Sequence, residues 1–322
     1  MFYVSRLTTA LIVAATILLG LPGRGHAEDY PTKPVRIIVQ TAAGSSIDVA
    51  ARILAENLAR RWGQQTIVLN QPGAGGAIAA RALSAAPNDG YTLFFAGSSV
   101  FVVLPELQKA LASEVKDFVP VAFIGETPMA IAVSAKTPAN SLGELLALAK
   151  KTAGGLNCAV STRGGLSHLS AELLKESAKA EMTFVHYPGT AQALTDVIAD
   201  RVPIVVDSIS AIVGPASGGQ VRILAVASPS RLKSRPDLPT AAEALPGFEA
   251  TAWFALVAPA GTSPEIVRRI GKDVDAVLQE PAVRTRLEEL GTFTRSMSAE
   301  ELRTFIEAQK QKWAPIVRGV GG

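Results

Sequence analysis

Small and hydroxyl-bearing residues gather in four short segments, each between an apolar run and a run with helical periodicity. The segments cover residues 41–48, 70–76, 161–167 and 187–191. Free backbone N–H groups at a helix start, together with the positive end of the helix dipole, attract anions. Glycine, serine and threonine allow a carboxylate to approach the backbone closely, and the hydroxyls add donors. Any one segment would also fit an ordinary strand–helix turn, but four together predict a site for a small anion.

Three residues of this pattern leave two interpretations open. Arg163 is either a solvated loop charge or a cation that binds a ligand carboxylate through two parallel N–H donors. Ser45 followed by Asp48 fits a helix cap, which competes with a direct ligand contact for Asp48. Asp207 ends an apolar run, so a place at the ligand site is weighed against a structural role.

Catalytic motifs are incomplete in this chain. Residues 73–78 fail the dinucleotide fingerprint because Ile78 stands where the third Gly or Ala belongs. Residues 165–169 resemble a nucleophile elbow, but Leu169 replaces the closing glycine and no histidine follows His186. His168 and His186 are interpreted as structural residues, and with one cysteine they lack zinc-ligand spacing. We therefore predict no enzyme, no metal and no cofactor, with a periplasmic enzyme as the weakest alternative.

The composition is that of a folded, exported protein. Of 322 residues, 48% are hydrophobic and 18% are charged, which argues against disorder. Arg6 precedes an apolar run over residues 7–21, and small residues at positions 25 and 27 predict a signal peptide, residues 1–27, that is cleaved. Its loss removes Arg6 and Arg24, so the net charge falls from +3 to 29 − 28 = +1. A near-neutral chain predicts no nucleic-acid partner, and we expect a soluble periplasmic protein.

Cys158 is the one cysteine of the sequence. A lone thiol cannot form an internal disulfide, even in an oxidising compartment. Cys158 lies in the apolar run 156–160, which predicts a buried and unreactive thiol.

Apolar runs alternate with helical patterns along most of the chain, which is typical of α/β proteins with parallel strands. The predicted strands cover residues 35–39, 65–69, 91–95, 129–133, 156–160, 182–186, 203–207, 221–227 and 253–258. The predicted helices cover residues 78–86, 141–151, 168–178, 190–199, 265–278 and 300–316, and an amphipathic segment lies near 50–58. The length predicts two domains. Domain 1 is expected to comprise residues 28–127 and 251–322, and domain 2 residues 128–250.

A series of short motifs runs along the chain. The motifs are YPTKPVRIIV at residues 30–39, NQPGAGG at 70–76, DGYTL at 89–93, VKDFVPV at 115–121, SHL at 167–169, YPG at 187–189, LPT at 238–240 and WFALVAPAGT at 253–262. Together they resemble the motifs of the Bug family, the extracytoplasmic receptors of tripartite tricarboxylate transporters. The resemblance spans essentially the whole mature chain, and the combination of motifs is specific.

The resemblance implies a two-domain periplasmic-binding-protein fold (type II, Venus-flytrap) that closes over a small carboxylate in an interdomain cleft. Implied ligands are di- or tricarboxylates, acidic amino acids and aromatic acids, and implied partners are the transporter's membrane subunits, with the receptor itself a monomer. A sensor that reports to a signalling receptor is the alternative, because it needs the same cleft. The candidate ligand-binding residues are Thr41, Ala43, Gly44, Ser45, Ser46, Asp48, Gly73, Ala74, Ser98, Ser161, Thr162, Arg163, Ser167 and Asp207.

The chain departs from the family pattern at four places. Its first loop reads QTAAGS at residues 40–45, where the family usually has Pro-Phe-x-Pro-Gly-Gly. Arg163 replaces a common glycine, Leu166 a small hydroxyl residue and His186 a frequent proline. We expect these changes to alter ligand choice rather than fold, with Arg163 contacting a second carboxylate or polar end of the ligand.

Overall fold

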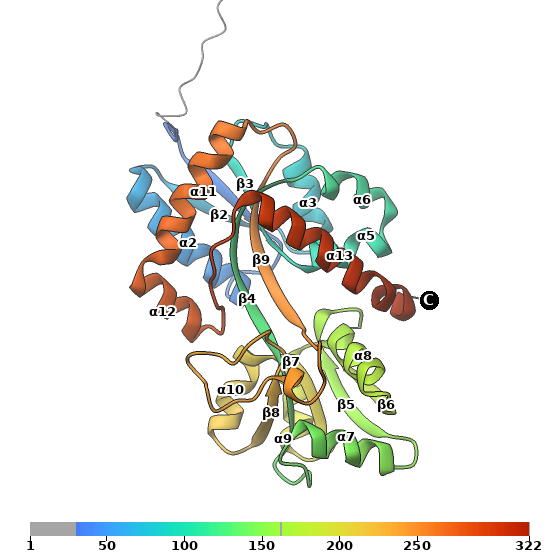
Figure 1. Cartoon of the computed structure of the whole chain (residues 1–322). Helices are drawn as coiled ribbons and strands as arrows, with labels where there is room; N and C mark the ends of the chain where they lie inside the picture. Colours follow the sequence, from blue (N-terminus) through green and yellow to red (C-terminus); the bar gives the residue numbers. More distant parts are fainter. Residues whose placement is uncertain (1–29, 162, 322) are drawn as a thin grey trace, which may run out of the picture.

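The computed structural model describes residues 30–161 and 163–321 as an α/β fold around one long sheet (Figure 1). The strands follow the order β2-β1-β3-β9-β4-β7-β5-β6, and β8 pairs with β4 beside this path. The predicted signal peptide lies outside the described residues. The strands are β1 Val35–Val39, β2 Thr66–Asn70, β3 Thr92–Gly97, β4 Val119–Ser134, β5 Leu156–Ser161, β6 Met182–Tyr187, β7 Ile204–Ser208, β8 Val221–Val226 and β9 Thr251–Ala258.

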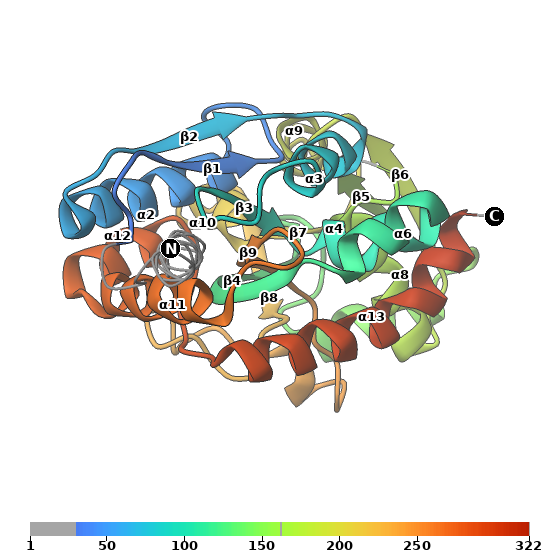
Figure 2. The ribbon, with the colours of Figure 1, turned by 90° about the horizontal axis from the view of Figure 1, so that it is seen from above.

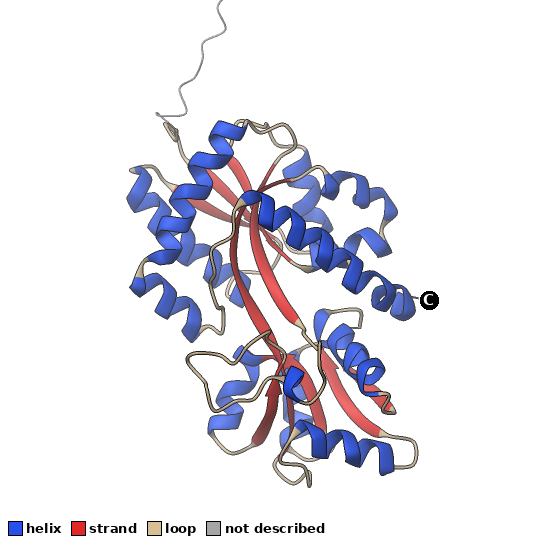
Figure 3. Cartoon of the chain, viewed as in Figure 1, coloured by secondary structure: helices blue, strands red, loops and turns tan. Residues whose placement is uncertain are grey.

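Helices cover both faces of this sheet (Figure 3). They are α2 Ser46–Trp62, α3 Ala77–Ser84, α4 Ser99–Val102, α5 Leu104–Leu107, α6 Lys109–Lys116, α7 Leu142–Lys151, α8 Leu166–Ala178, α9 Thr190–Ile198, α10 Ile209–Ser217, α11 Pro264–Gln279, α12 Pro281–Glu289 and α13 Ala299–Gly321, with the 3-10 turns η2 Ala74–Gly76 and η3 Ala241–Glu243.

The first group of strands consists of β1 to β3 with β9 and the first part of β4. β1 pairs in parallel with β2 and β3, whereas β9 runs antiparallel between β3 and β4. Helices α2, α11 and α12 bury apolar side chains against one face of this group. Helices α3, α4 and α13 pack against the other face, and Figure 2 shows α13 running along that side of the molecule.

Two strands carry the chain between the two groups. β4 pairs with β9 from Val119 opposite Ala258 to Pro128 opposite Thr251, and from Met129 onward it pairs with β7 and β8. Nearly every residue of β4 is buried. β4 is therefore one continuous strand that belongs to both halves of the sheet.

The second group contains β5 to β8 and the last part of β4. β5 runs parallel to β6 and β7, whereas β4 runs antiparallel to β7 and β8. Helices α7 and α8 cover one face and join the large hydrophobic cluster shared with the first group, whereas α9 and α10 enclose a separate cluster on the other face. Cys158 lies in the shared cluster with no exposed area, so the predicted burial of this thiol is confirmed.

The structure confirms the predicted strands and helices but differs in three respects. The sheet is mixed rather than parallel, because β4, β8 and β9 run against their neighbours. The predicted strand 129–133 is the end of a strand of 16 residues. Helices α4, α5, α6, α10 and α12 were not predicted; α4 and α5 have four residues each, which is too short for helical periodicity, and α10 contains Pro215.

Candidate functional site

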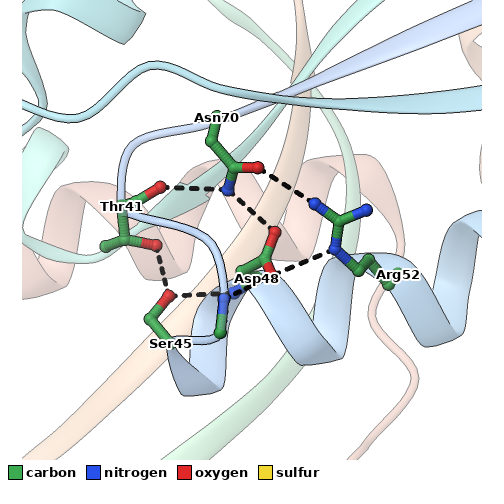
Figure 4. Close-up of polar contacts among 6 residues, drawn as sticks. Thr41, Ser45, Asp48, Arg52 and Asn70 are labelled. Atoms are coloured by element: carbon green, nitrogen blue, oxygen red, sulfur yellow. Dashed lines mark hydrogen bonds and ion pairs between the residues drawn. The ribbon is translucent and has the colours of Figure 1, made fainter.

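A hydrogen-bonded network fixes the loop between β1 and α2 (Figure 4). Ser45 caps α2, because its hydroxyl accepts the Asp48 N–H at 3.2 Å and lies 2.6 Å from the Thr41 hydroxyl. The Asp48 carboxylate accepts bonds from Asn70 at 2.8 Å and from Arg52 Nε at 3.0 Å. Asn70 also donates to the Thr41 carbonyl at 3.0 Å, which ties the end of β2 to this loop.

The Asp48 carboxylate therefore stabilises the conformation of this loop. Its side chain is buried, and its Oδ2 atom, which accepts the bond from Arg52, also accepts the Gly44 N–H at 2.8 Å. Burial alone would raise the pKa of Asp48, but the hydrogen bonds from Arg52, Gly44 and Asn70 outweigh it and lower the pKa below its usual value. The carboxylate is thus ionised at neutral pH and occupied by these donors.

The loop after β2 requires a backbone conformation that glycine adopts most easily. Gly73, Gly75 and Gly76 have φ values of 130°, 67° and 106°, and Ala74 is also left-handed at 47°. A Cβ added at Gly76 would lie 3.0 Å from Val100 Cγ2. The loop can therefore lie close against the start of α4.

Gln40 links the first loop to the loop after β3. Its side-chain oxygen accepts the Gly97 N–H at 2.9 Å, and its nitrogen donates to the Ser99 hydroxyl at 3.0 Å. The neighbouring Ser98 donates its backbone N–H to the Trp253 carbonyl at 2.8 Å. Three loops are thus held together at the carboxyl ends of β1, β2 and β3, where ligands bind in open α/β sheets.

Ser167 fixes the loop after β5. Its hydroxyl donates to the Val206 carbonyl at 2.6 Å and accepts the Ser161 N–H at 3.0 Å. The hydroxyl proton is thus donated to the protein, whereas the first backbone N–H groups of α8 have no partner within the helix. Free N–H groups at a helix start are of the kind that attracts an anion.

His168 also stabilises the loop between β5 and α8. Its Nδ1 accepts the Gly164 N–H at 3.1 Å. Burial, together with neighbouring His186 and Arg163, lowers the pKa of His168 to about 4. The imidazole is neutral at pH 7 and can accept this bond, which agrees with a structural role.

Asp207 lies at the end of β7, buried among donors. Its carboxylate accepts the Thr190 hydroxyl at 3.0 Å and the Ser208 N–H at 2.7 Å. Burial raises the pKa of Asp207 above its usual value, and the neighbouring donors Ser161, Ser208 and Thr190 offset this effect only in part. Asp207 is therefore easier to protonate than an exposed aspartate.

The loops of the two strand groups enclose a cavity of about 790 Å³. This volume lies in the range of small-molecule sites. The lining residues are Gln40, Thr41, Ile47, Gly73, Ala74, Gly75, Gly76, Gly97, Ser98, Ser99, Val103, Leu104, Leu107, Gln108, Met129, Ser161, Arg163, Gly164, Gly165, Leu166, Ser167, Thr190, Asp207, Ala252 and Phe254.

The cavity brings together many of the candidate residues named from the sequence. Those that line it are Thr41, Gly73, Ala74, Ser98, Ser161, Arg163, Ser167 and Asp207. Ala43, Gly44, Ser45 and Asp48 are not part of this lining, and the last three belong to the network around Asp48. Thr162 and the side chain of Ser46 lie outside the described part of the chain.

Most of the apolar part of the lining was not predicted; Ile47 and Leu166 lay within the predicted segments 41–48 and 161–167. The apolar part comprises Ile47, Val103, Leu104, Leu107, Met129, Leu166, Ala252 and Phe254. Residues 103–108 carry no motif, and their short helical turns gave no periodicity that could mark them. Thr190 lay within the predicted segment 187–191, but its bond to Asp207 depends on the sheet order, in which β5 lies between β6 and β7.

The charges in the cavity are few. Among the described lining residues, Arg163 is the one cation and Asp207 the one acid. In residues 30–161 and 163–321, no group of three or more His, Cys, Asp or Glu side chains is placed to hold a metal ion. The same residues contain no helix long and apolar enough to span a membrane.

Two strand groups joined by β4 and β9, with a cavity at the strands' carboxyl ends, define a periplasmic-binding-protein fold. Solved structures share it. An R. palustris protein solved with adipate is 31% identical, with a TM-score of 0.77, and the match covers 91% of this chain and 98% of that one. MatC from Rhodopseudomonas palustris, solved with bound malate, is 31% identical, with a TM-score of 0.73, covering 89% and 100% of the two chains.

Sequence comparison identifies the family. The family model described as tripartite tricarboxylate transporter family receptor matches residues 50–321. Protein BugT of Bordetella pertussis is 32% identical over 305 residues, which cover 94% of each chain. The chain belongs to the tripartite tricarboxylate transporter receptor family, and the resemblance seen in its motifs is confirmed.

Proposed function

We propose that this chain is a periplasmic receptor that captures a small carboxylate and presents it to the membrane subunits of a tripartite tricarboxylate transporter. The observation that carries the proposal is the cavity of about 790 Å³, lined by glycine- and serine-rich loops from both strand groups. Backbone N–H groups at the start of α8 suit a carboxylate. Adipate and malate in the two related structures support this ligand class.

Capture rests on closure of two domains around the ligand. We assign residues 28–127 and 251–322 to one domain and 128–250 to the other, because β4 changes partners between Pro128 and Met129. The ligand contacts loops of both domains and shifts the population toward a closed form. The membrane subunits recognise that form, and the receptor acts as a monomer.

Residues 1–27 direct the chain across the inner membrane and are then removed. No bond of the ligand is made or broken in this cycle, so the chain is not an enzyme. The residues that we assign to ligand binding are the candidates that line the cavity, namely Thr41, Gly73, Ala74, Ser98, Ser161, Arg163, Ser167 and Asp207.

A thermal-shift screen of the mature protein against di-, tri-, amino and aromatic acids tests the proposal. A ligand at 100 times its Kd should stabilise the fold by about 2.7 kcal/mol. We expect a shift with at least one acid, and mass spectrometry should recover that acid unchanged. Turnover of the acid would contradict the proposal, as would the absence of any shift in protein that native mass spectrometry shows to be ligand-free.

Substitution of Ser98, which lines the cavity, tests whether the acid binds in this cavity. S98A should weaken the acid found in the screen by about 0.5–1.5 kcal/mol if the hydroxyl bonds the ligand. The matched control is S84A, because Ser84 is exposed on α3 and bonds only to the Ala80 carbonyl. Equal affinity in both variants would remove Ser98 from the ligand contacts.

A further inference from the structure

Arg163 is an exposed cation at the cavity with no acidic partner. It lines the cavity wall in the loop between β5 and α8. Each of the ion pairs found within residues 30–161 and 163–321 joins other side chains, so Arg163 forms none there. An unpaired guanidinium in a cavity is a ready partner for a carboxylate, which it can bind through two parallel N–H groups.

The other charged group of the lining directs an anion toward Arg163. Asp207 is buried at the end of β7, and its oxygens already accept bonds from Thr190 and Ser208. A ligand carboxylate beside an ionised Asp207 would meet like charge. One end of a ligand can still bind the backbone N–H groups of the loops, but a second anionic group is favoured at the Arg163 side of the cavity.

The cavity that Arg163 lines also has an apolar wall. Val103, Leu104 and Leu107 project from the α4–α5 region, and Leu166 begins α8. Side chains of this kind gain from covering methylene groups, and they cannot satisfy a ligand hydroxyl. The apolar wall therefore favours a ligand whose middle section is a hydrocarbon chain over one with hydroxyl groups.

The cavity also has room beyond Arg163. A smaller cavity of about 200 Å³ shares part of its wall with the main one and ends against α13. The side chain of Leu107, 52% exposed, lies at both cavities. The residues of this smaller cavity are Leu107, Arg163, Gly164, Leu169, Val317 and Val320.

From these features we infer that Arg163 is the specificity-determining residue of the site, and that it selects dicarboxylates with an unsubstituted hydrocarbon middle. One carboxylate lies on the loop N–H groups, the chain crosses Leu104, Leu107 and Leu166, and the second carboxylate pairs with Arg163. The inference rests on the proposed function, because it assigns the ligand class of the same cavity.

Calorimetric titration with matched acids tests this assignment. Pimelate and suberate are compared with heptanoate and octanoate, which lack only the second carboxylate, and with malate and citrate, which carry hydroxyls. The wild-type protein should bind each dicarboxylate at least about tenfold more tightly than its monocarboxylate, a difference of ~1.4 kcal/mol. R163Q should abolish most of that ratio and leave monocarboxylate affinity within about twofold, whereas R163K should retain part of it.

The matched control is R36Q, since Arg36 is exposed on β1, near the end of the strand remote from the loops. It should leave all affinities unchanged. Wild-type protein that binds none of the acids would contradict the proposed function itself. Binding of carboxylates with a ratio that R163Q leaves intact, or preferred binding of malate and citrate, would overturn the inference about Arg163 while the proposed function stands.

Discussion

The carboxylate of Asp48 organises three segments that are distant in sequence. It bonds to the Gly44 amide, to Arg52 in α2 and to Asn70 at the end of β2. These donors fix the first loop, whose Thr41 reaches the cavity. The residue therefore acts on the site through loop shape rather than through contact with a ligand.

We predict that D48N lowers the free energy of unfolding by about 1.5–3 kcal/mol at pH 7, because the donors lose a charged acceptor. The pKa of Asp48 is lowered in the folded state from about 3.8, so the stabilisation is present above pH ~3.8 and is lost as the pH falls below it. Urea unfolding at several pH values should show the two proteins converging in acid.

A control on the same helix is E56Q. Glu56 is exposed in α2 and lies 3.6 Å from Arg286, so its removal should change stability by less than about 0.5 kcal/mol. If D48N were as stable as E56Q at pH 7, the network around Asp48 would not contribute to the free energy of unfolding.

The residue types in the loops predicted the chemistry of the site, but they did not predict which contact each residue makes. Glycines and hydroxyl residues marked the segments that line the cavity, and Arg163 was named from the sequence alone. Ser98 lines the cavity, whereas Ser45 caps α2. This difference depends on the conformation of each loop, which the residue types do not specify. Leu104 and Leu107 were not predicted as cavity residues, because they reach the cavity only through the packing of α5 beside the loops.

Helix α11 packs closely on β4. A Cβ added at Gly271 would lie 2.9 Å from the Val121 carbonyl oxygen, which belongs to the strand backbone and cannot move aside freely. Glycine is otherwise a poor helix residue. Its presence here allows the close approach of α11 to β4.

We therefore predict that G271A destabilises the protein by about 1–3 kcal/mol through overpacking, despite a helix-propensity gain of about 0.5–1 kcal/mol. In G319A, on α13, the new Cβ would meet nothing within 4 Å, so that variant should be neutral or more stable by up to about 0.5 kcal/mol. Chemical denaturation measures both. A stable G271A would show that α11 can shift away from β4.

At the scale of elements, hydrophobic periodicity predicted most strands and longer helices. It failed for the first part of β4, residues 119–128, where the chain is buried on both faces and no alternation remains. Hydrophobic periodicity also did not predict strand direction. The antiparallel direction of β9 follows from the path of the preceding chain, which periodicity does not describe.

In the whole molecule, one hydrophobic cluster joins the two strand groups. It contains Phe94 and Trp253 from the first group and Val160 and Leu169 from the second. Loss of packing in one group therefore exposes apolar surface in the other, and the two groups should unfold together.

We predict a single calorimetric unfolding transition for the ligand-free protein, with van't Hoff and calorimetric enthalpies that agree. Differential scanning calorimetry of the mature chain checks this expectation. Two resolved transitions would mean that the shared cluster contributes little and that each strand group is stable by itself.

The late position of β9 in the chain affects the order in which the protein can be built. β9 ends at residue 258 of 322 and lies between β3 and β4, which end at residues 97 and 134. A ribosome has thus made 258/322, about four fifths, of the polypeptide before the first strand group can close. Until then β3 and β4 lack the neighbour that joins them, so the nascent chain stays incompletely folded, which suits the export proposed above.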